Sequence, residues 1–328
     1  MIITRSPLRI SIAGGGTDLE SFYKKYTSTF ISVAINSYVY VTINKPFIEK
    51  YILKYSQTEI IKNLNDIKHG LFREILKKFS KKNDYVEIST TADVPYGTGL
   101  GSSGAFANSL IKAITTHNRQ NLNFEEIAEN SFSIETKKLK EIAGKQDPFI
   151  SAFGGLSKFE INKSGKVKSN RIDININDIN KFNDNLLLFF IGYSRSSSKI
   201  LSSQINETRK KNKDLIKNLK KTQSQVKEIE QCILKGKFDE YGDIMKEHWI
   251  RKKERSILMS NKYIDDIYEF ALNHGALGGK LVGAGGGGFL LFYSNKPEGL
   301  RYEMRKKNIR ELRFSFDFEG TKNIFVKY

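Results

Sequence analysis

Residues 95–105 read PYGTGLGSSGA, and the segment AFANSLIKAITTH, which has the spacing of a helix, follows directly. The stretch contains the glycines Gly97, Gly99, Gly101 and Gly104. Glycine lacks the Cβ atom that would keep a ligand away from the main chain, so several N–H groups can point at one anion. A helix that begins near Ser102 adds unpaired N–H groups and a positive dipole end, which favour phosphate. The residues alone therefore predict either an anion-binding loop or a glycine-rich turn, with Ser102 and Ser103 as helix caps or metal ligands.

The length and composition of the chain limit the classes of protein to consider. A chain of 328 residues predicts about two domains and a large core. The single cysteine, Cys232, excludes an intramolecular disulfide framework and is expected as an apolar filler on a helix. Because no apolar run approaches a membrane span and the N-terminus lacks a signal-peptide core, we expect a cytoplasmic protein. The four histidines are scattered without ligand spacing, which argues against a zinc site.

The formal charge of +18 raises the alternative of a non-catalytic nucleic-acid-binding protein. Lysine is spread through segments such as REILKKFSKK and ETRKKNKDLIKNLKK, together with abundant Asn and Ile, which is typical of a general compositional bias. We therefore expect no specific nucleic-acid partner and no membrane partner. The sequence carries no signal for the oligomeric state.

Strand and helix signals alternate along the chain. Each predicted strand is β-branched, aromatic or apolar, and each predicted helix repeats apolar residues at intervals of three and four. Strands are predicted at 6–14, 30–46, 84–95, 185–192, 311–318 and 322–328. Helices are predicted at 59–79, from Ser102, at 124–139 with Asn123 as cap, and at 215–234, 238–249, 263–275 and 301–307. The helix at 238–249 carries a stripe of Phe238, Tyr241, Met245 and Trp249, predicted as core.

Three glycine-bearing segments occur in order: PLRISIAGGGTD at 7–18, PYGTGLGSSGA at 95–105 and KLVGAGGGGF at 280–289. Together they resemble the GHMP kinases, the family of galactokinase, homoserine kinase and mevalonate kinase. The second segment matches the family's phosphate-binding pattern, with the usual alanine displaced by one residue because Gly104 intervenes. The first aligns with the sugar-kinase form of the N-terminal motif, although Leu8, Gly15 and Gly16 replace its Gly, Glu and His.

The resemblance implies an α/β (α+β) fold in two halves. The N-terminal half, residues 1–175, would resemble the second domain of ribosomal protein S5, and the C-terminal half, 176–328, would be ferredoxin-like. The polar, turn-rich stretch 162–185 is the best candidate for the connection. The last strand can return to the N-terminal sheet, which makes this boundary a soft one.

The resemblance also decides between the two interpretations of the glycine loop, because in the family this loop binds the β- and γ-phosphates of ATP. No Walker-type Gly-Lys-Ser/Thr follows the glycines, so this is not a P-loop. Residues expected to bind ATP are Pro95, Gly97, Gly99, Leu100, Gly101, Ser102, Ser103 and Gly104.

The catalytic and metal-binding residues are inferred from the same resemblance. Glu135 lies twelve residues before Asp147, about the interval between the family's metal-binding glutamate and catalytic aspartate. Glu135 would hold Mg²⁺ with Ser103 or Ser102, Asp147 would be the base, and Arg9 would stabilise negative charge at the reacting centre. Without the resemblance, Glu135 could equally be a surface carboxylate, Asp147 a turn residue, and Arg9 a solvated residue on an edge strand. Pro148 departs from the Gln that related sugar kinases often carry.

The substrate is inferred from four sequence segments: AGGGTDL, GLGSSGAF, AGKQDPFISAFGG and GYSRSSSKIL. These are most similar to the family branch that phosphorylates the anomeric hydroxyl of D-glycero-D-manno-heptose 7-phosphate, while L-fucokinase and galactokinase-like enzymes are the alternative. A carboxylate that accepts from two hydroxyls suits a sugar. Residues expected to bind the sugar substrate are Gly16, Thr17, Asp18, Gly285, Gly286 and Gly287.

A sugar that already carries a phosphate requires cations at its far end. The stretch SRSSSK at 194–199 supplies Arg195, Lys199 and hydroxyl groups. We therefore predict that Arg195 and Lys199 bind the distal phosphate. A basic helix start explains the same residues equally well.

Overall fold

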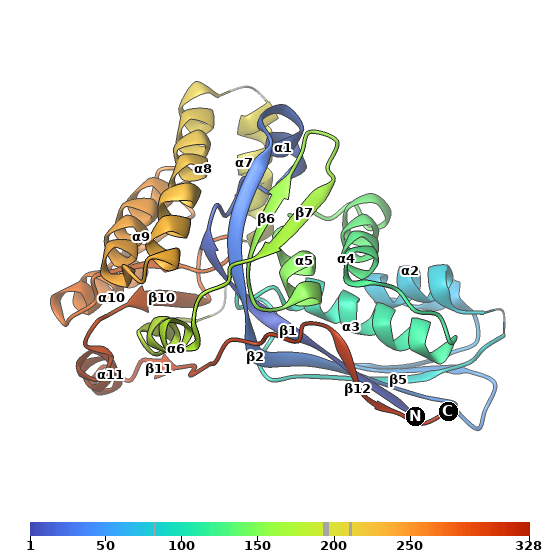
Figure 1. Cartoon of the computed structure of the whole chain (residues 1–328). Coiled ribbons are helices and arrows are strands. Elements are labelled where there is room, and N and C mark those ends of the chain that lie inside the picture. Colours follow the sequence, from blue (N-terminus) through green and yellow to red (C-terminus); the bar gives the residue numbers. More distant parts are fainter. Residues whose placement is uncertain (82, 193–196, 210–211) are drawn as a thin grey trace.

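The molecule contains two β-sheets (Figure 1). The computed structural model describes residues 1–81, 83–192, 197–209 and 212–328, without the side chains of 197–199 and 209. The first half contains β1 (Ile2–Ala13), α1 (Glu20–Tyr26), β2 (Ser28–Asn44), β3 (Tyr51–Lys54), β4 (Thr58–Ile61), α2 (Gly70–Phe79), β5 (Glu87–Ala92), α3 (Ser102–His117), α4 (Phe124–Ser133), α5 (Gln146–Phe153), β6 (Leu156–Ile161) and β7 (Val167–Arg171). The second contains α6 (Ile176–Asp184), β8 (Leu186–Phe190), α7 (Ser197–Arg209), α8 (Lys213–Leu234), α9 (Phe238–Lys253), α10 (Lys262–Asn273), β9 (Gly278–Leu281), β10 (Phe289–Tyr293), α11 (Pro297–Lys306), β11 (Arg310–Glu311) and β12 (Lys322–Val326). Helices α2 to α5 lie beside the larger sheet, and α8 to α11 lie around the smaller one (Figure 1).

The larger sheet has the strand order β12-β1-β2-β5-β3-β4, with β6 pairing to β2 and β7 to β6. The smaller sheet has the order β11-β8-β10-β9, and its pairs are antiparallel. Strand β12 pairs with β1, where Ile2 lies opposite Val326. The last strand therefore returns to the sheet in which the chain begins, as the sequence allowed.

The two faces of β1 serve different parts of the molecule because side chains alternate along a strand. Leu8, Ile10 and Ile12 lie in a core that also contains side chains of α8 and α9. Arg9 and Ser11, on the opposite face, form hydrogen bonds with side chains of α5. One face of β1 thus packs in the core that both halves share, and the other face presents polar side chains to α5.

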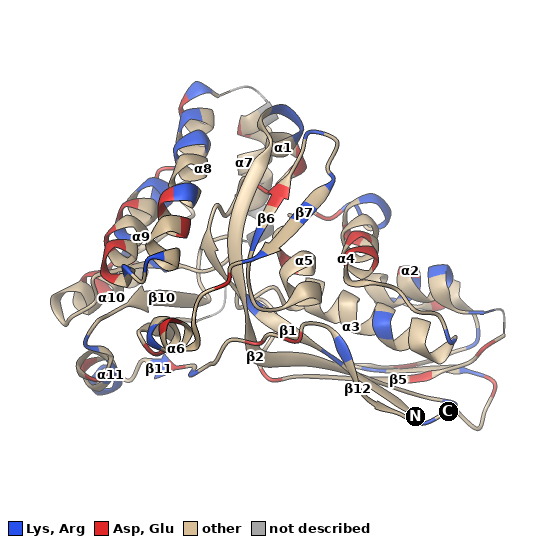
Figure 2. Ribbon diagram, viewed as in Figure 1, with Lys and Arg blue, Asp and Glu red and all other residues tan. Residues whose placement is uncertain are grey.

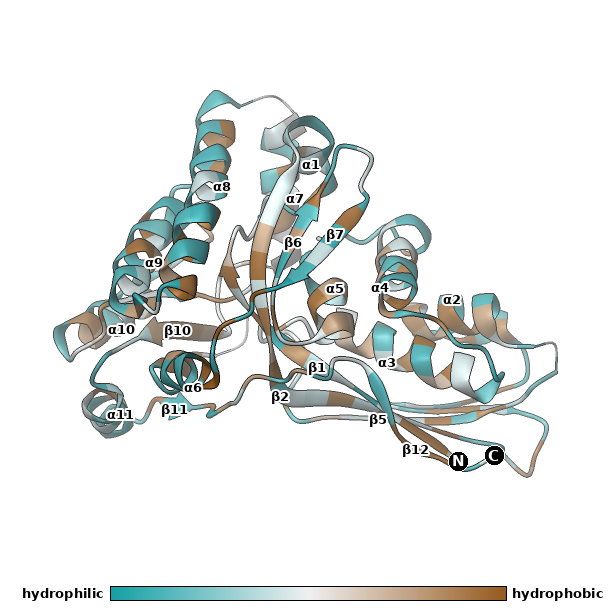
Figure 3. Cartoon of the chain, in the orientation of Figure 1, coloured by the Kyte–Doolittle hydropathy of each residue, from teal (hydrophilic) through white to brown (hydrophobic). Residues whose placement is uncertain are grey.

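That core is continuous across the two halves. From the C-terminal half it includes Phe182, Leu188, Val226, Ile229 and Tyr241. Hydropathy alternates along α8 and α9 in Figure 3, as expected for helices with one buried face. Burial of the stripe Phe238, Tyr241, Met245 and Trp249, and of Cys232, confirms the prediction that they are core.

The helix predicted at 59–79 is wrong in its first half. Residues 58–61 form the short strand β4, and only Gly70–Phe79 is α-helical. The carboxylate of Glu59 is buried and accepts hydrogen bonds from the amide of Lys68 at 2.8 Å and from the hydroxyl of Tyr55 at 2.8 Å. Pairing with β3 and these polar contacts outweigh the helical spacing.

One of the next two stretches contains elements that were not predicted, and the other differs from its prediction. The connection predicted at 162–185 contains β7, which forms a hairpin with β6, and the helix α6. The strand predicted at 311–318 is reduced to β11 and one isolated bridge between Phe316 and Ile35. In both places the partner strand, which is distant or hidden in the sequence, decides the local structure.

Lysine and arginine lie on helices of both halves, including α2, α8, α9 and α11, with acidic residues among them (Figure 2). Within the described ranges, no helix has both the length and the apolar character needed to cross a bilayer.

We expect Ile10→Ala to lower the free energy of unfolding by about 2–5 kcal/mol, because it leaves a cavity in the core shared by both halves. Ile10 is 0% exposed, whereas Ile60, on β4, is 55% exposed and serves as the control. Ile60→Ala should change stability by about 0.5 kcal/mol or less. Urea denaturation followed by circular dichroism measures both. Equal midpoints for the two variants would contradict this description of the shared core.

Candidate active site

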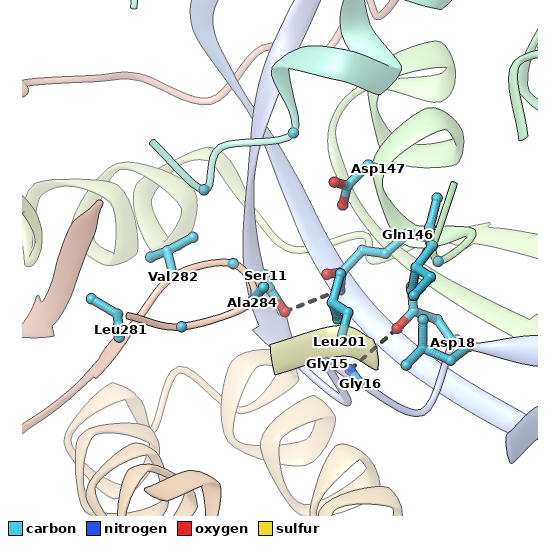
Figure 4. Close-up of a pocket in the computed structure, with 18 of the residues that line it drawn as sticks. Ser11, Gly15, Gly16, Asp18, Gln146, Asp147, Leu201, Leu281, Val282 and Ala284 are labelled. Atoms are coloured by element: carbon cyan, nitrogen blue, oxygen red, sulfur yellow. Dashed lines mark hydrogen bonds between the residues drawn. The ribbon is translucent and has the colours of Figure 1, made fainter. Parts of the chain in front are cut away.

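One pocket lies where the three glycine segments meet, and residues of both halves line it (Figure 4). The N-terminal half contributes side chains from β1, from the loops 15–19 and 96–104, and from α5. The C-terminal half contributes α7, α9 and the loop 281–287. Asp147 and Gln146 project from α5, while Val282 and Ala284 lie on the opposite wall in this view.

Helix α3 begins immediately after Gly101, whose φ of 76° is in the left-handed region. No side chain caps this helix. The structure therefore does not support the alternative in which Ser102 or Ser103 caps it, and the first N–H groups of the helix keep no side-chain acceptor. An uncapped N-terminus beside a glycine loop can bind an anionic group.

The second and third glycine segments touch each other through their backbones. A Cβ atom on Gly99 would lie 2.8 Å from the carbonyl oxygen of Val282, and one on Gly283 would lie 2.7 Å from the Cα of Gly99. Both glycines also have positive φ angles, of +83° and +77°. Any side chain at either position would push the two loops apart, and with them the two halves of the pocket wall.

Arg9 joins three parts of the site. Its Nε donates to Oδ1 of Asp147 at 2.7 Å, and its Nη1 donates to the carbonyl oxygen of Gly99 at 2.6 Å. Its own amide donates to the carbonyl oxygen of Leu100 at 3.0 Å. Arg9 is buried, while the Asp147 side chain keeps 36% exposure. The guanidinium thus fixes one carboxylate oxygen and leaves Asp147 open to the pocket.

The departures at Gly104 and Pro148 are explained by the same close packing. A Cβ on Gly104 would lie 3.0 Å from the nitrogen of Pro148, so glycine lets α3 approach α5. Pro148 lies in the first turn of α5, where a missing N–H costs no helical hydrogen bond. Its carbonyl oxygen accepts from Asn108 at 2.7 Å, which ties the two helices together.

Glu135 lies in a π-helical turn, Ile134–Lys138, that continues α4. The turn places Glu135 inward at 3% exposure, and Ser103 Oγ donates to its carboxylate. Burial raises the pKa of Glu135 to about 7, the nearby Asp147 adds to the rise, and the hydrogen bond from Ser103 opposes it.

The capping box of Asn123 and Glu126 that starts α4 confirms the predicted cap.

The oxygen atoms of Ser103 and Glu135 are the kind of ligand that Mg²⁺ prefers. Among the described residues, no group of three or more His, Cys, Asp or Glu side chains is placed to hold a metal. Magnesium here would need phosphate oxygens or water to complete its coordination, which is how it usually binds beside a nucleotide. The two residues therefore fit that metal.

Asp18 lies beside α5. Its carboxylate accepts from the amides of Gly16 at 3.2 Å and Gln146 at 3.1 Å. Burial raises its pKa and the neighbouring Asp147 adds to the rise, although the backbone hydrogen bonds act against it. Thr17 is buried, and its hydroxyl donates to the carbonyl oxygen of Gly14 at 2.8 Å. Neither residue caps α1, which begins after Leu19 without a side-chain cap.

The structure brings most of the predicted site residues to this pocket. Those that line it are Arg9, Gly16, Asp18, Gly97, Gly99, Gly101, Ser102, Ser103, Gly104, Glu135, Asp147, Gly285 and Gly287. Pro95, Leu100, Thr17 and Gly286 do not line it. Arg195 lies outside the described residues, and so does the side chain of Lys199.

Sequence reasoning missed four basic residues in the lining: His248, Lys252, Arg255 and Lys280. Lys252 and Arg255 belong to a lysine-rich stretch at the end of α9 that looks like a solvated helix face. The one available signal was the position of Lys280 at the start of the third glycine segment.

Comparison with known proteins gives the family. The GHMP kinases N terminal domain matches residues 65–155, and the GHMP kinases C terminal domain matches residues 229–310. The D-glycero-alpha-D-manno-heptose 7-phosphate kinase of Campylobacter jejuni is 30% identical, over 98% of this chain and 98% of that protein. The chain belongs to the GHMP kinase family. As a GHMP kinase it uses ATP, and the expected two-half α/β fold of the family is confirmed.

Solved structures agree with this assignment. A D-glycero-D-manno-heptose 1-phosphate kinase from Bacteroides thetaiotaomicron has a TM-score of 0.82 at 22% identity, covering 100% of both chains. A putative sugar kinase from Campylobacter jejuni has a TM-score of 0.74 at 26% identity, covering 98% of this GHMP kinase and 97% of that chain. The galactokinase of Lactococcus lactis shares the fold, with a TM-score of 0.73 at 15% identity over 99% of this chain and 95% of that one.

Gly144 gives a test of the packing around Asp18. A Cβ atom there would lie 1.9 Å from Asp18 Oδ2, so Gly144→Ala must displace the buried carboxylate from its amide partners. We expect the free energy of unfolding to fall by about 1–3 kcal/mol. Gly299, in α11, has open space around it, and Gly299→Ala should raise stability by about 0.5–1 kcal/mol. Chemical denaturation measures the change in the free energy of unfolding for both variants. A stabilising Gly144→Ala would contradict the placement of Asp18.

Proposed function

We propose that this GHMP kinase transfers the γ-phosphoryl group of ATP to the anomeric hydroxyl of D-glycero-D-manno-heptose 7-phosphate, giving the 1,7-bisphosphate for nucleotide-heptose synthesis. The observation that carries the proposal is the Arg9–Asp147 ion pair at the mouth of the glycine loop. Similarity along nearly the whole chain to a heptose 7-phosphate kinase supports the choice of sugar.

Asp147 is the proposed base. The oxygen Oδ1 is held by Arg9, so Oδ2 is the atom that would accept the proton of the anomeric hydroxyl. As the O–H bond breaks, the sugar oxygen bonds to the γ-phosphorus, and the bond to the oxygen that ADP keeps is broken. In such transfers the protein acts chiefly by positioning and by electrostatic stabilisation.

Arg9 acts on both partners of this step. Its guanidinium holds the carboxylate of Asp147 in place, and it lies against the glycine loop, where negative charge develops on the transferring group. Because the guanidinium is buried and bonded on two sides, it needs little reorganisation during the reaction.

ATP phosphates are proposed to bind the amides from Gly97 to Gly104 and the N-terminus of α3. Ser103, or its neighbour Ser102, and Glu135 would hold Mg²⁺, which when bound neutralises phosphate charge. The hydrogen bond between Ser103 and Glu135 already brings these two ligands together.

The sugar is proposed to lie beside Asp18 and Gly16, with the loop 285–287 on the opposite side. Thr17 stays a proposed sugar-binding residue from the sequence alone, since its hydroxyl donates to the carbonyl oxygen of Gly14. Arg195 and Lys199 remain proposed ligands of the distal phosphate from the sequence alone. Since ATP and sugar phosphates are cytoplasmic metabolites, we propose the cytoplasm as the location.

A second candidate is another anomeric sugar kinase. The bifunctional fucokinase/GDP-fucose pyrophosphorylase of Arabidopsis thaliana is 28% identical over 67% of this chain, although the match spans only 21% of that protein. A fucokinase has no distal phosphate to bind, so the need for that group separates the two candidates.

A panel of sugars and sugar phosphates, tested for ATP consumption, decides between the candidates. We expect heptose 7-phosphate to give a kcat/KM about tenfold or more above those of L-fucose, galactose and unphosphorylated heptose, because a bound phosphate adds charged hydrogen bonds. Phosphorus NMR should show the new phosphate at the anomeric carbon. A higher kcat/KM for L-fucose or galactose would favour the second candidate.

Asp147→Asn should lower kcat by about 10² to 10⁴, the usual contribution of a general base, and leave the KM for ATP nearly unchanged. Arg9→Ala should also act mainly on kcat. In the double variant the two losses should be less than additive, because both residues serve one transition state. Steady-state kinetics on the best substrate measures these effects.

The matched control is Asp266→Asn, since Asp266 is an exposed carboxylate on α10 outside the pocket. Its kcat should equal that of the parent enzyme. Near-parental kcat for Asp147→Asn on the best substrate would disprove the catalytic assignment, and the family membership would then describe only the fold and the nucleotide site.

A further inference from the structure

Three basic side chains of the C-terminal half converge on the floor of the pocket. Lys252 lies at the end of α9, Arg255 follows that helix, and Lys280 lies on β9. Lys252 is buried, and Lys280 is only 2% exposed. Lysine is rarely buried to this degree without an acidic partner.

The contacts of this cluster are hydrogen bonds to uncharged groups. Lys252 Nζ donates to the carbonyl oxygens of Leu281 at 2.8 Å and Gly283 at 2.7 Å. Lys280 Nζ donates to the carbonyl oxygen of Ile12 at 2.6 Å. Ammonium and guanidinium groups can donate more hydrogen bonds than these, so donors remain for a ligand.

Arg255 is held in the same way. Its Nη1 donates to the carbonyl oxygen of Gly15 at 3.0 Å, and its other nitrogens donate to Thr222 and Asn218. Within the described part of the chain, no carboxylate forms an ion pair with any of the three cations. The residues whose placement is left undescribed include no Asp or Glu. Among the described residues, the carboxylate of Glu254 acts on the charge of Arg255, and it forms no direct ion pair with the cluster.

Burying cations together without a counter-ion has an electrostatic cost. Burial, with repulsion from Arg255 and Arg9, lowers the pKa of Lys280 to about 7. Burial and the same kind of repulsion lower the pKa of Lys252 well below its usual range. An anion placed among these groups would relieve the repulsion and restore the charged forms.

His248 strengthens the case for a ligand at this position. It is buried, it lines the pocket, and neither ring nitrogen has a hydrogen-bond partner among the residues that the structure describes. Burial, reinforced by Lys280 and the other nearby cations, lowers its pKa well below the usual value. A neutral imidazole still offers one N–H donor to an anion.

We infer that Lys252, Arg255 and Lys280 form a binding site for the phosphate group that the sugar substrate already carries. This site is in addition to Arg195 and Lys199, which are proposed from the sequence. The inference rests on the proposed function, because it assigns the distal phosphate of that substrate. A phosphate dianion accepts many hydrogen bonds at once, and three cations with spare donors match it.

The location of the cluster favours the sugar over ATP as the source of this phosphate. Lys280 and Arg255 bond to the carbonyl oxygens of Ile12 and Gly15, in the segment that leads to Asp18. The ATP phosphates already have the amides of residues 97–104 and the uncapped end of α3. The cluster comes from other elements, namely α9, the residues that follow it and β9.

The test uses two charge-removing variants, Lys280→Met and Lys252→Met, with Lys246→Met as the control. Lys246 is exposed on the same helix α9, away from the pocket. Methionine keeps the apolar stem and removes a buried charge, so the fold should survive, and thermal unfolding checks this. If one variant fails to fold, the other carries the test.

The first measurement is binding of inorganic phosphate without nucleotide, by titration calorimetry. We expect affinity to fall about 10- to 100-fold in each pocket variant and to stay unchanged in the control. Folded pocket variants that bind inorganic phosphate as tightly as the parent would overturn the site. This measurement does not depend on which sugar is the substrate.

The second measurement is steady-state kinetics with heptose 7-phosphate, unphosphorylated heptose and ATP. We expect the KM for heptose 7-phosphate to rise about 10- to 100-fold, with little change in the KM values for heptose and ATP. A rise confined to the KM for ATP would assign the cluster to the nucleotide and overturn the inference. Equal losses for both sugars would also overturn it.

The two measurements separate failure of the inference from failure of the proposed function. If the parent phosphorylates heptose 7-phosphate but the variants do so equally well, the function stands and the inference falls. A second outcome is that the parent phosphorylates no heptose phosphate, while the variants bind inorganic phosphate more weakly than the parent does. In that case the site stands, and its ligand is the phosphate of another substrate.

Discussion

The position of Arg9 is the constraint on which the site depends. The alternation of side chains along β1 turns this residue away from the shared core and toward α5 and the glycine loop. Its bonds to Asp147 and Gly99 then connect a strand, a helix and a loop. A buried guanidinium must be satisfied on several sides, so these three elements can hold only a narrow range of relative positions.

The pocket combines acidic groups from one half with basic groups from the other. Asp18, Glu135 and Asp147 come from the N-terminal half, and Lys252, Arg255 and Lys280 come from the C-terminal half. Arg9 lies between the two sets, where its charge repels Lys252 and Lys280. Both kinds of charge therefore act on any ligand that enters the pocket.

The sequence predicted the parts of the site that depend on local chemistry. Glycines can be recognised wherever a backbone must approach another group, so the three loops and the residues beside them were found. The burial of Glu135 depends on a π-helical turn, and the strand at Glu59 depends on contacts with a hairpin partner. Lys252 looked like a solvated lysine because only tertiary packing carries it inside. Helical periodicity records none of the three, because each depends on backbone geometry or on pairing and packing contacts.

The pairing of β12 with β1 has a consequence for how the molecule is made. Strand β1 leaves the ribosome roughly three hundred residues before its neighbour on the outer edge, residues 322–326. Two buried side-chain hydrogen bonds, between Ser6 and Thr321 and between Tyr38 and Asp317, also cannot form until residues 317–321 have been synthesised. The N-terminal half therefore cannot complete its sheet before the C-terminal half has been made, and the two halves mature together rather than in sequence during translation.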